Sequence, residues 1–210
     1  MPDLSMERMC TGLVAGVDEA GRGPWAGPVV AAAVILPIDP PQGLLTGLDD
    51  SKKLSAPRRE VLLTAISACA DIGIGAASVA EIERENILTA TNAAMRRAIN
   101  GLTTLPDTAL IDGNRLPPNL PCTGRTMVKG DSLSLSIAAA SIVAKVTRDR
   151  IMRALASRYP AFGWEKNAGY GTRQHQDGLA ATGVTPHHRR SYAPIAKILS
   201  LGGLGGADIV

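Results

Sequence analysis

Residues 16–24 read GVDEAGRGP, in which an apolar run meets two acids and a sharp turn. The apolar run Leu13–Val17 ends in Asp18 and Glu19, and the glycines and proline that follow interrupt regular structure. Pro28–Leu36 is then a continuous apolar run rich in Val and Ala, which is typical of a strand buried on both faces. We therefore expect two successive strands, with an acidic pair where the first one ends.

The rest of the chain alternates between short apolar runs and helical patterns. The further predicted strands are Ile72–Ala77, Ala109–Ile111 and Thr126–Val128. The predicted helices begin after the N-cap Ser55, at the capping box Ser78–Glu81 and at Ile87, and a long helix with Asp131 at its start covers residues 132–158, up to Pro160. This order predicts an α/β domain with a mixed five-stranded sheet flanked by helices.

Charge is distributed unevenly along the chain. The whole sequence carries 22 Lys and Arg against 19 Asp and Glu, a net charge of +3. Residues 1–144 hold 12 basic and 15 acidic side chains, whereas residues 145–197 hold 10 basic and 3 acidic ones. A basic segment beside an acidic body suits an enzyme that acts on nucleic acid, and a solvated helical surface fits the same charges equally well.

Cysteine usage and hydropathy exclude several classes of protein. The three cysteines, Cys10, Cys69 and Cys122, are far apart, so neither a zinc site nor a disulfide framework is indicated. The first ten residues contain Asp3 and Glu7 and no apolar signal region. The apolar run Val29–Leu36 is too short to span a bilayer. We expect a cytoplasmic protein with no membrane partner.

Four acids stand where the predicted strands and the long helix begin or end. Asp18 and Glu19 close the first strand, Asp112 closes the fourth, and Asp131 opens the long helix. If strands one and four are neighbours, Asp18 and Asp112 face each other, and such carboxylates repel unless a cation neutralises them. Ligands that are all oxygen favour Mg²⁺ or Mn²⁺, and two such ions about 4 Å apart can hydrolyse a phosphodiester. The alternative is that each acid is a turn or cap residue, Asp131 above all.

Several blocks of the sequence resemble the bacterial ribonuclease HII family, in the family's order, between about residues 12 and 196. The blocks are residues 16–24 with 26–33, then 50–54, 111–114, 129–131 leading into 136–145, 169–172 and 188–191. The resemblance implies an RNase H-like fold with a small helical C-terminal extension. It implies an endoribonuclease that cuts the RNA strand of RNA–DNA hybrids and cuts 5′ of single ribonucleotides in duplex DNA, leaving a 3′-hydroxyl and a 5′-phosphate.

The resemblance also implies the cofactors, the site and the organisation of the chain. The catalytic, metal-binding acids would be Asp18, Glu19, Asp112 and Asp131, holding two Mg²⁺ or Mn²⁺ ions at the catalytic step. We expect an RNase H-like catalytic domain over residues 12–158, a basic helical extension over 159–200 and a disordered tail over 201–210. The protein is expected to act as a monomer.

Substrate contacts are expected in the glycine turn and in the basic segment. Gly21-Arg22-Gly23 lets backbone groups approach a 2′-hydroxyl, and by resemblance this turn reads the ribose. By resemblance Tyr170 packs on the deoxyribose that follows the ribonucleotide. The remaining predicted contacts are Lys52, Lys53, Lys129, His188 and Arg189. Each assignment has a structural alternative: the glycine segment is an ordinary turn, Tyr170 lies at the edge of the core, and the lysines are solvated. The four arginines of the long helix suit a solvated face: Arg148, Arg150, Arg153 and Arg158.

Two other functions fit the same acids. One is a DNA nuclease or transposase of the same fold, because a fold does not determine its substrate. The other is a nucleic-acid-binding protein whose acids are structural. The Gly21–Gly23 turn together with Tyr170 favours the ribonuclease, since cleavage of DNA alone gives no reason for a 2′-hydroxyl reader.

Overall fold

The computed structural model describes residues 1–202, and a mixed five-stranded sheet forms its centre. The strands are β1 (Val14–Ala20), β2 (Val29–Ile35), β3 (Asp71–Ala77), β4 (Thr108–Asp112) and β5 (Thr123–Met127), in the order β3-β2-β1-β4-β5. β2 runs antiparallel to β1 and β3, whereas β4 runs parallel to β1 and β5. The predicted mixed sheet is confirmed, and the two acid-bearing strands, β1 and β4, are neighbours.

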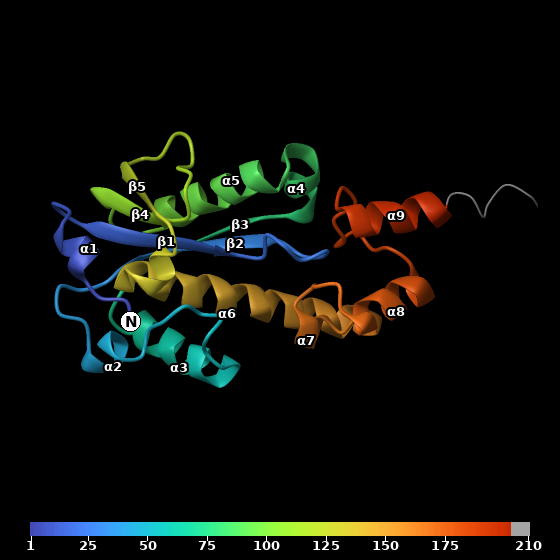
Figure 1. Ribbon diagram of the computed structural model, residues 1–210, viewed down its shortest axis with the longest axis horizontal. Helices are drawn as coiled ribbons and strands as arrows, with labels where there is room; N and C mark the ends of the chain where they lie inside the picture. Colours follow the sequence, from blue (N-terminus) through green and yellow to red (C-terminus); the bar gives the residue numbers. More distant parts are fainter. Residues whose placement is uncertain (203–210) are drawn as a thin grey trace, which may run out of the picture.

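Helices cover both faces of the sheet (Figure 1). One face carries α4 (Val79–Glu85) and α5 (Ile87–Asn100), and the other carries α6 (Leu135–Arg158), α3 (Ala56–Ser67) and the short α2 (Gln42–Leu45). The short α1 (Ser5–Arg8) lies beside the start of β1 (Figure 1). The capping box at Ser78 and Glu81 forms as predicted, and Asn86 separates α4 from α5 and caps the second helix.

Small residues let the helices approach the sheet closely. Every residue of β2 is buried, with Ala31 and Ala33 in the core under α5 and Ala32 and Val34 in the core under α6. At Gly16 the backbone of α6 comes so near that a Cβ would lie 2.1 Å from the carbonyl carbon of Ser136. A chain with only 3% aromatic residues thus fills its core by close backbone approach.

The start of the long helix differs from the prediction. α6 begins at Leu135, and the Ser134 side chain caps it by accepting a hydrogen bond from the backbone N–H of Ile137. Asp131 lies four residues before Leu135, in a 3-10 turn, η1 (Gly130–Ser132). The interpretation of Asp131 as the N-cap is therefore wrong, because Ser134 performs that role.

Other element ends also shift by a few residues. β1 continues to Ala20, so Asp18 and Glu19 lie within the strand, near its C-terminal end, rather than beyond it. β5 begins at Thr123, three residues before its predicted start. These are ordinary fraying differences and leave the topology unchanged.

The C-terminal part is a helical extension with its own small core. It comprises η2 (Pro160–Phe162), α7 (Trp164–Asn167), α8 (Arg173–Thr182) and α9 (Ala193–Gly202). Phe162, Trp164 and Ile195 pack with Met152 of α6 and with Ala26, so the extension is built onto the end of α6 and the loop after β1. α9 runs two residues past the predicted limit of 200, and the rest of the predicted tail lies outside the described residues. Within residues 1–202, every helix is too short or too polar to cross a bilayer.

Candidate active site

The four acids meet at the ends of the two central parallel strands. Val17 of β1 is paired with Ile111 of β4, so the next residues, Asp18 and Asp112, are neighbours on one face of the sheet. Asp112 Oδ1 accepts a hydrogen bond of 2.7 Å from the backbone N–H of Gly130, which ties the turn carrying Asp131 to β4. Strand pairing and this one tether bring acids from three distant parts of the sequence together.

Burial and neighbouring charges disfavour the charged forms of Asp18, Glu19 and Asp131. Asp18 is only 5% exposed; burial raises its pKa well above the usual range, and the charges of Glu19 and Asp112 raise it further. Burial also raises the pKa of Glu19, although the Arg22 guanidinium at 3.3 Å opposes the shift. Burial and Asp112 raise the pKa of Asp131. Carboxylates held together against their own charge are typical of a site that receives a cation.

The donor set fits a hard divalent cation. All four side chains are carboxylates, with neither His nor Cys among them, and such donors suit Mg²⁺ or Mn²⁺. Within residues 1–202 there is no group of three or more His, Cys, Asp or Glu side chains close enough together to bind one metal ion. Glu19 instead accepts a hydrogen bond from Arg22. The acids are therefore gathered, but their oxygens do not close around a single point.

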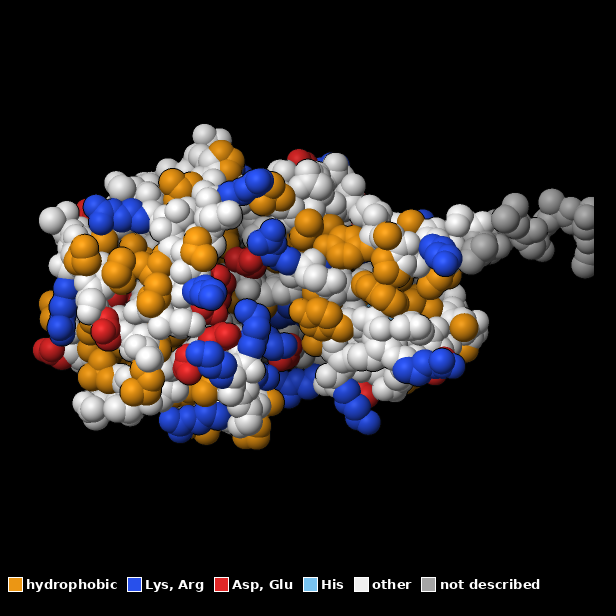
Figure 2. Space-filling view, viewed as in Figure 1, with side chains coloured by type: hydrophobic (Ala, Val, Ile, Leu, Met, Phe, Trp, Pro, Cys, Tyr) orange, Lys and Arg blue, Asp and Glu red, His pale blue; other side chains and the backbone are white. Residues whose placement is uncertain are grey.

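Two cavities share Glu19 and Arg22 in their linings. The first, of about 410 Å³, is lined by Glu19, Ala20, Gly21, Arg22, Gly23, Ser51, Lys52, Arg59, Ser141, Lys145, Arg148 and Tyr170. The second, of about 330 Å³, lies against α5 and β4 and includes Asn92, Asp112, Asn114 and Arg115. Figure 2 shows acidic side chains gathered in a hollow of this face with Lys and Arg side chains around it. Open space therefore adjoins Glu19 in both cavities and Asp112 in the second.

The three predicted lysines differ in their surroundings. Lys52 lines the first cavity with its side chain 79% exposed. Burial works to lower the pKa of Lys52, but Asp50 and the site acids Asp18, Asp131 and Asp112 raise it on balance. Lys53 instead pairs with Asp49 at 2.9 Å. Lys129 is exposed, and its backbone adopts the left-handed conformation just before η1. Lys52 is therefore the lysine that faces the acids.

Tyr170 lies beside the glycine turn and is 52% exposed. A Cβ on Gly23 would lie 3.5 Å from the Tyr170 ring, so the two are in contact range. The backbone N–H of Trp25 donates to the Gly169 carbonyl at 2.9 Å, which fastens this loop to the turn. So exposed a ring does not fit the alternative of an aromatic residue at the edge of the core.

His188 and Arg189 do not lie where the sequence interpretation placed them. Their exposed fractions are 1% and 0%, so the prediction that they contact substrate is wrong. Arg189 donates to the backbone carbonyls of Gly21 and Arg22, and His188 lies 3.0 Å from the ring of His175. Burial lowers the pKa of His188 to about 4, which keeps its ring neutral.

The basic segment is largely used inside the protein. Arg148, expected on a solvated face, is buried and donates to the carbonyls of Ala26, Pro28 and Ala168. Arg150 and Arg153 of α6 pair with Glu60 of α3. The excess of positive charge in residues 145–197 is therefore not one free patch for phosphates.

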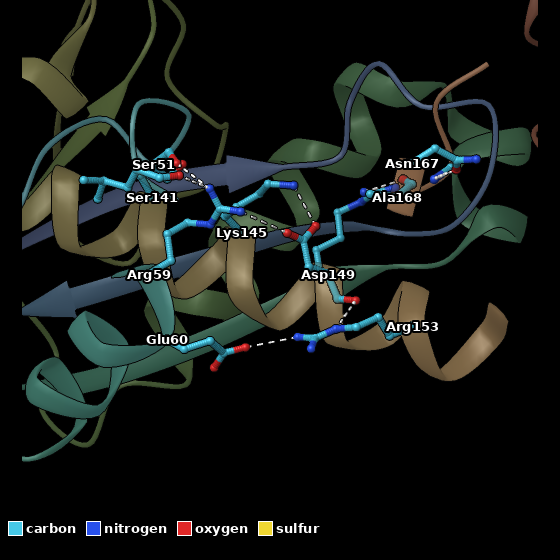
Figure 3. A network of polar contacts seen from close by, with 12 residues as sticks. Ser51, Arg59, Glu60, Ser141, Lys145, Asp149, Arg153, Asn167 and Ala168 are labelled. Atoms are coloured by element: carbon cyan, nitrogen blue, oxygen red, sulfur yellow. Dashed lines mark hydrogen bonds and ion pairs between the residues drawn. The ribbon is translucent and has the colours of Figure 1, made fainter. Parts of the chain in front are cut away.

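A polar network on the floor of the first cavity was not predicted from the sequence. Arg59 donates to the Ser51 carbonyl and reaches Asp149, which also pairs with Lys145 (Figure 3). The hydroxyl of Ser141 donates to that of Ser51 at 2.8 Å. Ser51, Ser141 and Lys145 lie inside blocks that carried the family resemblance, and that was the available signal; Arg59 had none.

Comparisons with known proteins show the family of this chain. The family model described as "Ribonuclease HII" matches residues 15–195. Ribonuclease HII of Rhodospirillum rubrum is 59% identical over 215 residues, which cover 100% of this chain and 97% of the relative.

Solved structures agree as well. The ribonuclease H2 crystal structure from Pyrococcus horikoshii OT3 covers 90% of this chain and 98% of its own, with a TM-score of 0.76 at 28% identity. A Bst ribonuclease HIII structure in complex with Mn²⁺ covers 94% and 72%, with a TM-score of 0.71 at 18% identity, and shares the fold. The family model and the matches to ribonuclease HII of Rhodospirillum rubrum and to the Pyrococcus horikoshii structure favour the ribonuclease over a DNA nuclease, a transposase or a non-catalytic binding protein. The chain belongs to the ribonuclease HII family, the endoribonucleases that act on RNA–DNA hybrids.

Proposed function

We propose that Asp18, Glu19, Asp112 and Asp131 bind divalent cations, Mg²⁺ or Mn²⁺, and that the enzyme cuts the phosphodiester 5′ of a ribonucleotide. Cleavage leaves a 3′-hydroxyl and a 5′-phosphate, both in RNA–DNA hybrids and at single ribonucleotides in duplex DNA. The observation that carries this proposal is the cluster of four carboxylates, in which burial and neighbouring charges raise the pKa values of Asp18, Glu19 and Asp131. The Bst ribonuclease HIII structure, which has the same fold and contains Mn²⁺, supports the choice of metal.

When bound, one or two such ions would activate a water and neutralise charge on the scissile phosphate. The chain's own residues hold and orient the substrate. Gly130 keeps Asp112 and the Asp131 turn together, and Lys52 carries positive charge toward the incoming phosphates. Arg22 forms an ion pair with Glu19, and a bound cation would replace Arg22 as the partner of that carboxylate.

The two cavities suggest the direction in which the strand runs. The first cavity contains the Gly21–Gly23 turn and Tyr170, so it suits the ribose and the deoxyribose that follows it. The second cavity then receives the nucleotide 5′ of the cut, near Asn92 and Asn114. Glu19 borders both cavities, which supports a binding mode in which the scissile phosphate lies over the acids. All of these residues belong to one chain, so a monomer suffices.

Asp112→Asn tests the proposal. The amide keeps the shape of the side chain and removes a charge that a divalent cation needs, so cleavage should fall at least about 10²-fold while duplex binding stays near that of the wild type. Asp177→Asn, an exposed acid paired with Arg173 on α8, is the matched control and should cleave normally. Cleavage by Asp112→Asn above roughly a tenth of wild type would remove Asp112 from the site.

A further inference from the structure

The two residues that proved to be buried, His188 and Arg189, lie directly beneath the predicted sugar-reading elements. Arg189 Nη2 donates to the Gly21 carbonyl at 2.5 Å, and Nη1 donates to the Arg22 carbonyl at 2.8 Å. Nε and Nη2 donate to the Gly27 carbonyl at 3.1 and 2.8 Å. One fully buried guanidinium thus holds both ends of the loop that contains the glycine turn.

A second polar chain leads from His188 to Tyr170. His175 Nδ1 lies 2.9 Å from the Tyr170 carbonyl, which only accepts, so this nitrogen carries the proton. In a neutral ring, His175 Nε2 is then unprotonated and can only accept. Its two neighbours are the indole N–H of Trp164 at 3.3 Å and His188 Nε2 at 3.0 Å. His188 therefore donates through Nε2.

The other ring nitrogen of His188 completes a single consistent arrangement. His188 Nδ1 accepts from the backbone N–H of Thr185 at 3.0 Å, so every ring nitrogen of the pair has a defined role. This arrangement requires both rings to be neutral, and burial lowers the pKa values of both His175 and His188. The backbone of Tyr170 is thereby hydrogen-bonded to a buried, neutral pair of rings.

Backbone contacts join the two systems. His188 forms an antiparallel bridge with Ala26, and the backbone N–H of Arg189 donates to the Trp25 carbonyl at 2.7 Å. The backbone N–H of Trp25 in turn donates to the Gly169 carbonyl, next to Tyr170. The glycine turn and Tyr170 are therefore held by adjacent residues of one segment, although Gly21 and Arg189 are 168 positions apart.

We propose that His188 and Arg189 are positioning residues that lock the Gly21–Gly23 turn and Tyr170 into one rigid sugar-reading surface. Arg189 sets the turn that reads the ribose, and His188, acting through His175, sets the ring that reads the next sugar. This inference rests on the proposed function, since it assigns a support to the reader rather than a new ligand. A rigid reader matters because a displacement of about 1 Å can cost on the order of 10²-fold in rate.

Binding measurements test the role of Arg189 without any cleavage. With EDTA present, fluorescence anisotropy compares a DNA duplex containing one ribonucleotide with the same duplex made of DNA alone. Arg189→Lys keeps the charge, but one amine cannot reach the carbonyls of Gly21, Arg22 and Gly27 together. Its preference for the ribonucleotide duplex should fall roughly fivefold or more, with affinity for all-DNA duplex unchanged within about twofold.

Cleavage ratios test the role of His188. His188→Leu has a similar volume and no ring nitrogens, and it should lower the rate on an embedded ribonucleotide relative to an all-RNA hybrid. His188→Gln returns an amide donor and should restore much of that ratio. Ile99→Ala, on the buried face of α5, is the control for a general loss of stability, and it should leave both ratios unchanged because a smaller folded fraction affects all substrates alike.

The outcomes separate the two proposals. A folded Arg189→Lys protein with wild-type discrimination, or an unchanged cleavage ratio in His188→Leu, would overturn the positioning role. If Arg189→Lys does not fold, the His188 pair decides alone. A wild-type protein that binds both duplexes equally would instead refute sugar reading itself, and the positioning role with it.

Discussion

Gly21 is the position at which a single methyl group should do the most damage to the site. Its φ is +99°, a conformation that residues with a Cβ rarely adopt. A Cβ there would lie 2.0 Å from Nε and 2.4 Å from Cδ of Arg148, and 2.8 Å from the Pro28 carbonyl. Arg148 cannot move aside cheaply, because its guanidinium donates to three backbone carbonyls. Gly21→Ala must therefore displace the glycine turn.

The cost follows from these contacts. A positive φ costs a residue with a Cβ about 1–2 kcal/mol, and an extra methyl in a packed position costs about 1–3 kcal/mol. For a chain of this size each kcal/mol lowers Tm by about 2–4 °C, so Gly21→Ala should lower it by roughly 4–20 °C. If the turn moves by about 1 Å, single-turnover cleavage should fall on the order of 10²-fold.

Gly23→Ala is the matched variant for stability. Its Cβ would meet the Tyr170 ring at 3.5 Å, an ordinary contact, so Tm should stay within about 2 °C of wild type. Thermal unfolding followed by circular dichroism and cleavage of a duplex with one ribonucleotide measure both variants. If Gly21→Ala melts within about 2 °C of wild type and cleaves normally, the reasoning from φ and the Arg148 contact is refuted.

Three further predictions concern the ring, the acids and the metal. Tyr170→Ala should slow cleavage of a single embedded ribonucleotide roughly tenfold or more relative to an all-RNA hybrid, and Tyr170→Phe should slow it less, because the ring remains; equal ratios would show that Tyr170 does not read the junction. Because the folded state raises the pKa of Asp18, the metal-free protein should lose stability as pH rises above the unfolded pKa of about 4. Asp18→Asn should flatten this decline when urea unfolding is followed upward from about pH 4, and equal slopes would contradict the shift. EDTA should abolish cleavage, and Mg²⁺ or Mn²⁺ should restore it, whereas restoration by Zn²⁺ alone would argue against a site built from carboxylates.

Local patterns in the sequence were sufficient for the main layers of the fold. The apolar run of β2 and the capping box at Ser78 depend on neighbours within a few residues, so both were predictable. Asp18 and Asp112 could be proposed as partners because each follows an apolar strand, but only the parallel pairing of β1 and β4 brings them together.

Tertiary contacts decided what the sequence pattern could not. Asp131 and Ser134 are both good N-caps, and the hydrogen bond between Gly130 and Asp112, from another part of the chain, is what leaves Asp131 in the site and Ser134 at the helix. His188 and Arg189 stand in a basic segment and are typical of a solvated or phosphate-binding surface. Their burial depends on carbonyls and rings supplied by the β1–β2 loop and α8, and side-chain polarity alone cannot reveal a partner so far away in the sequence.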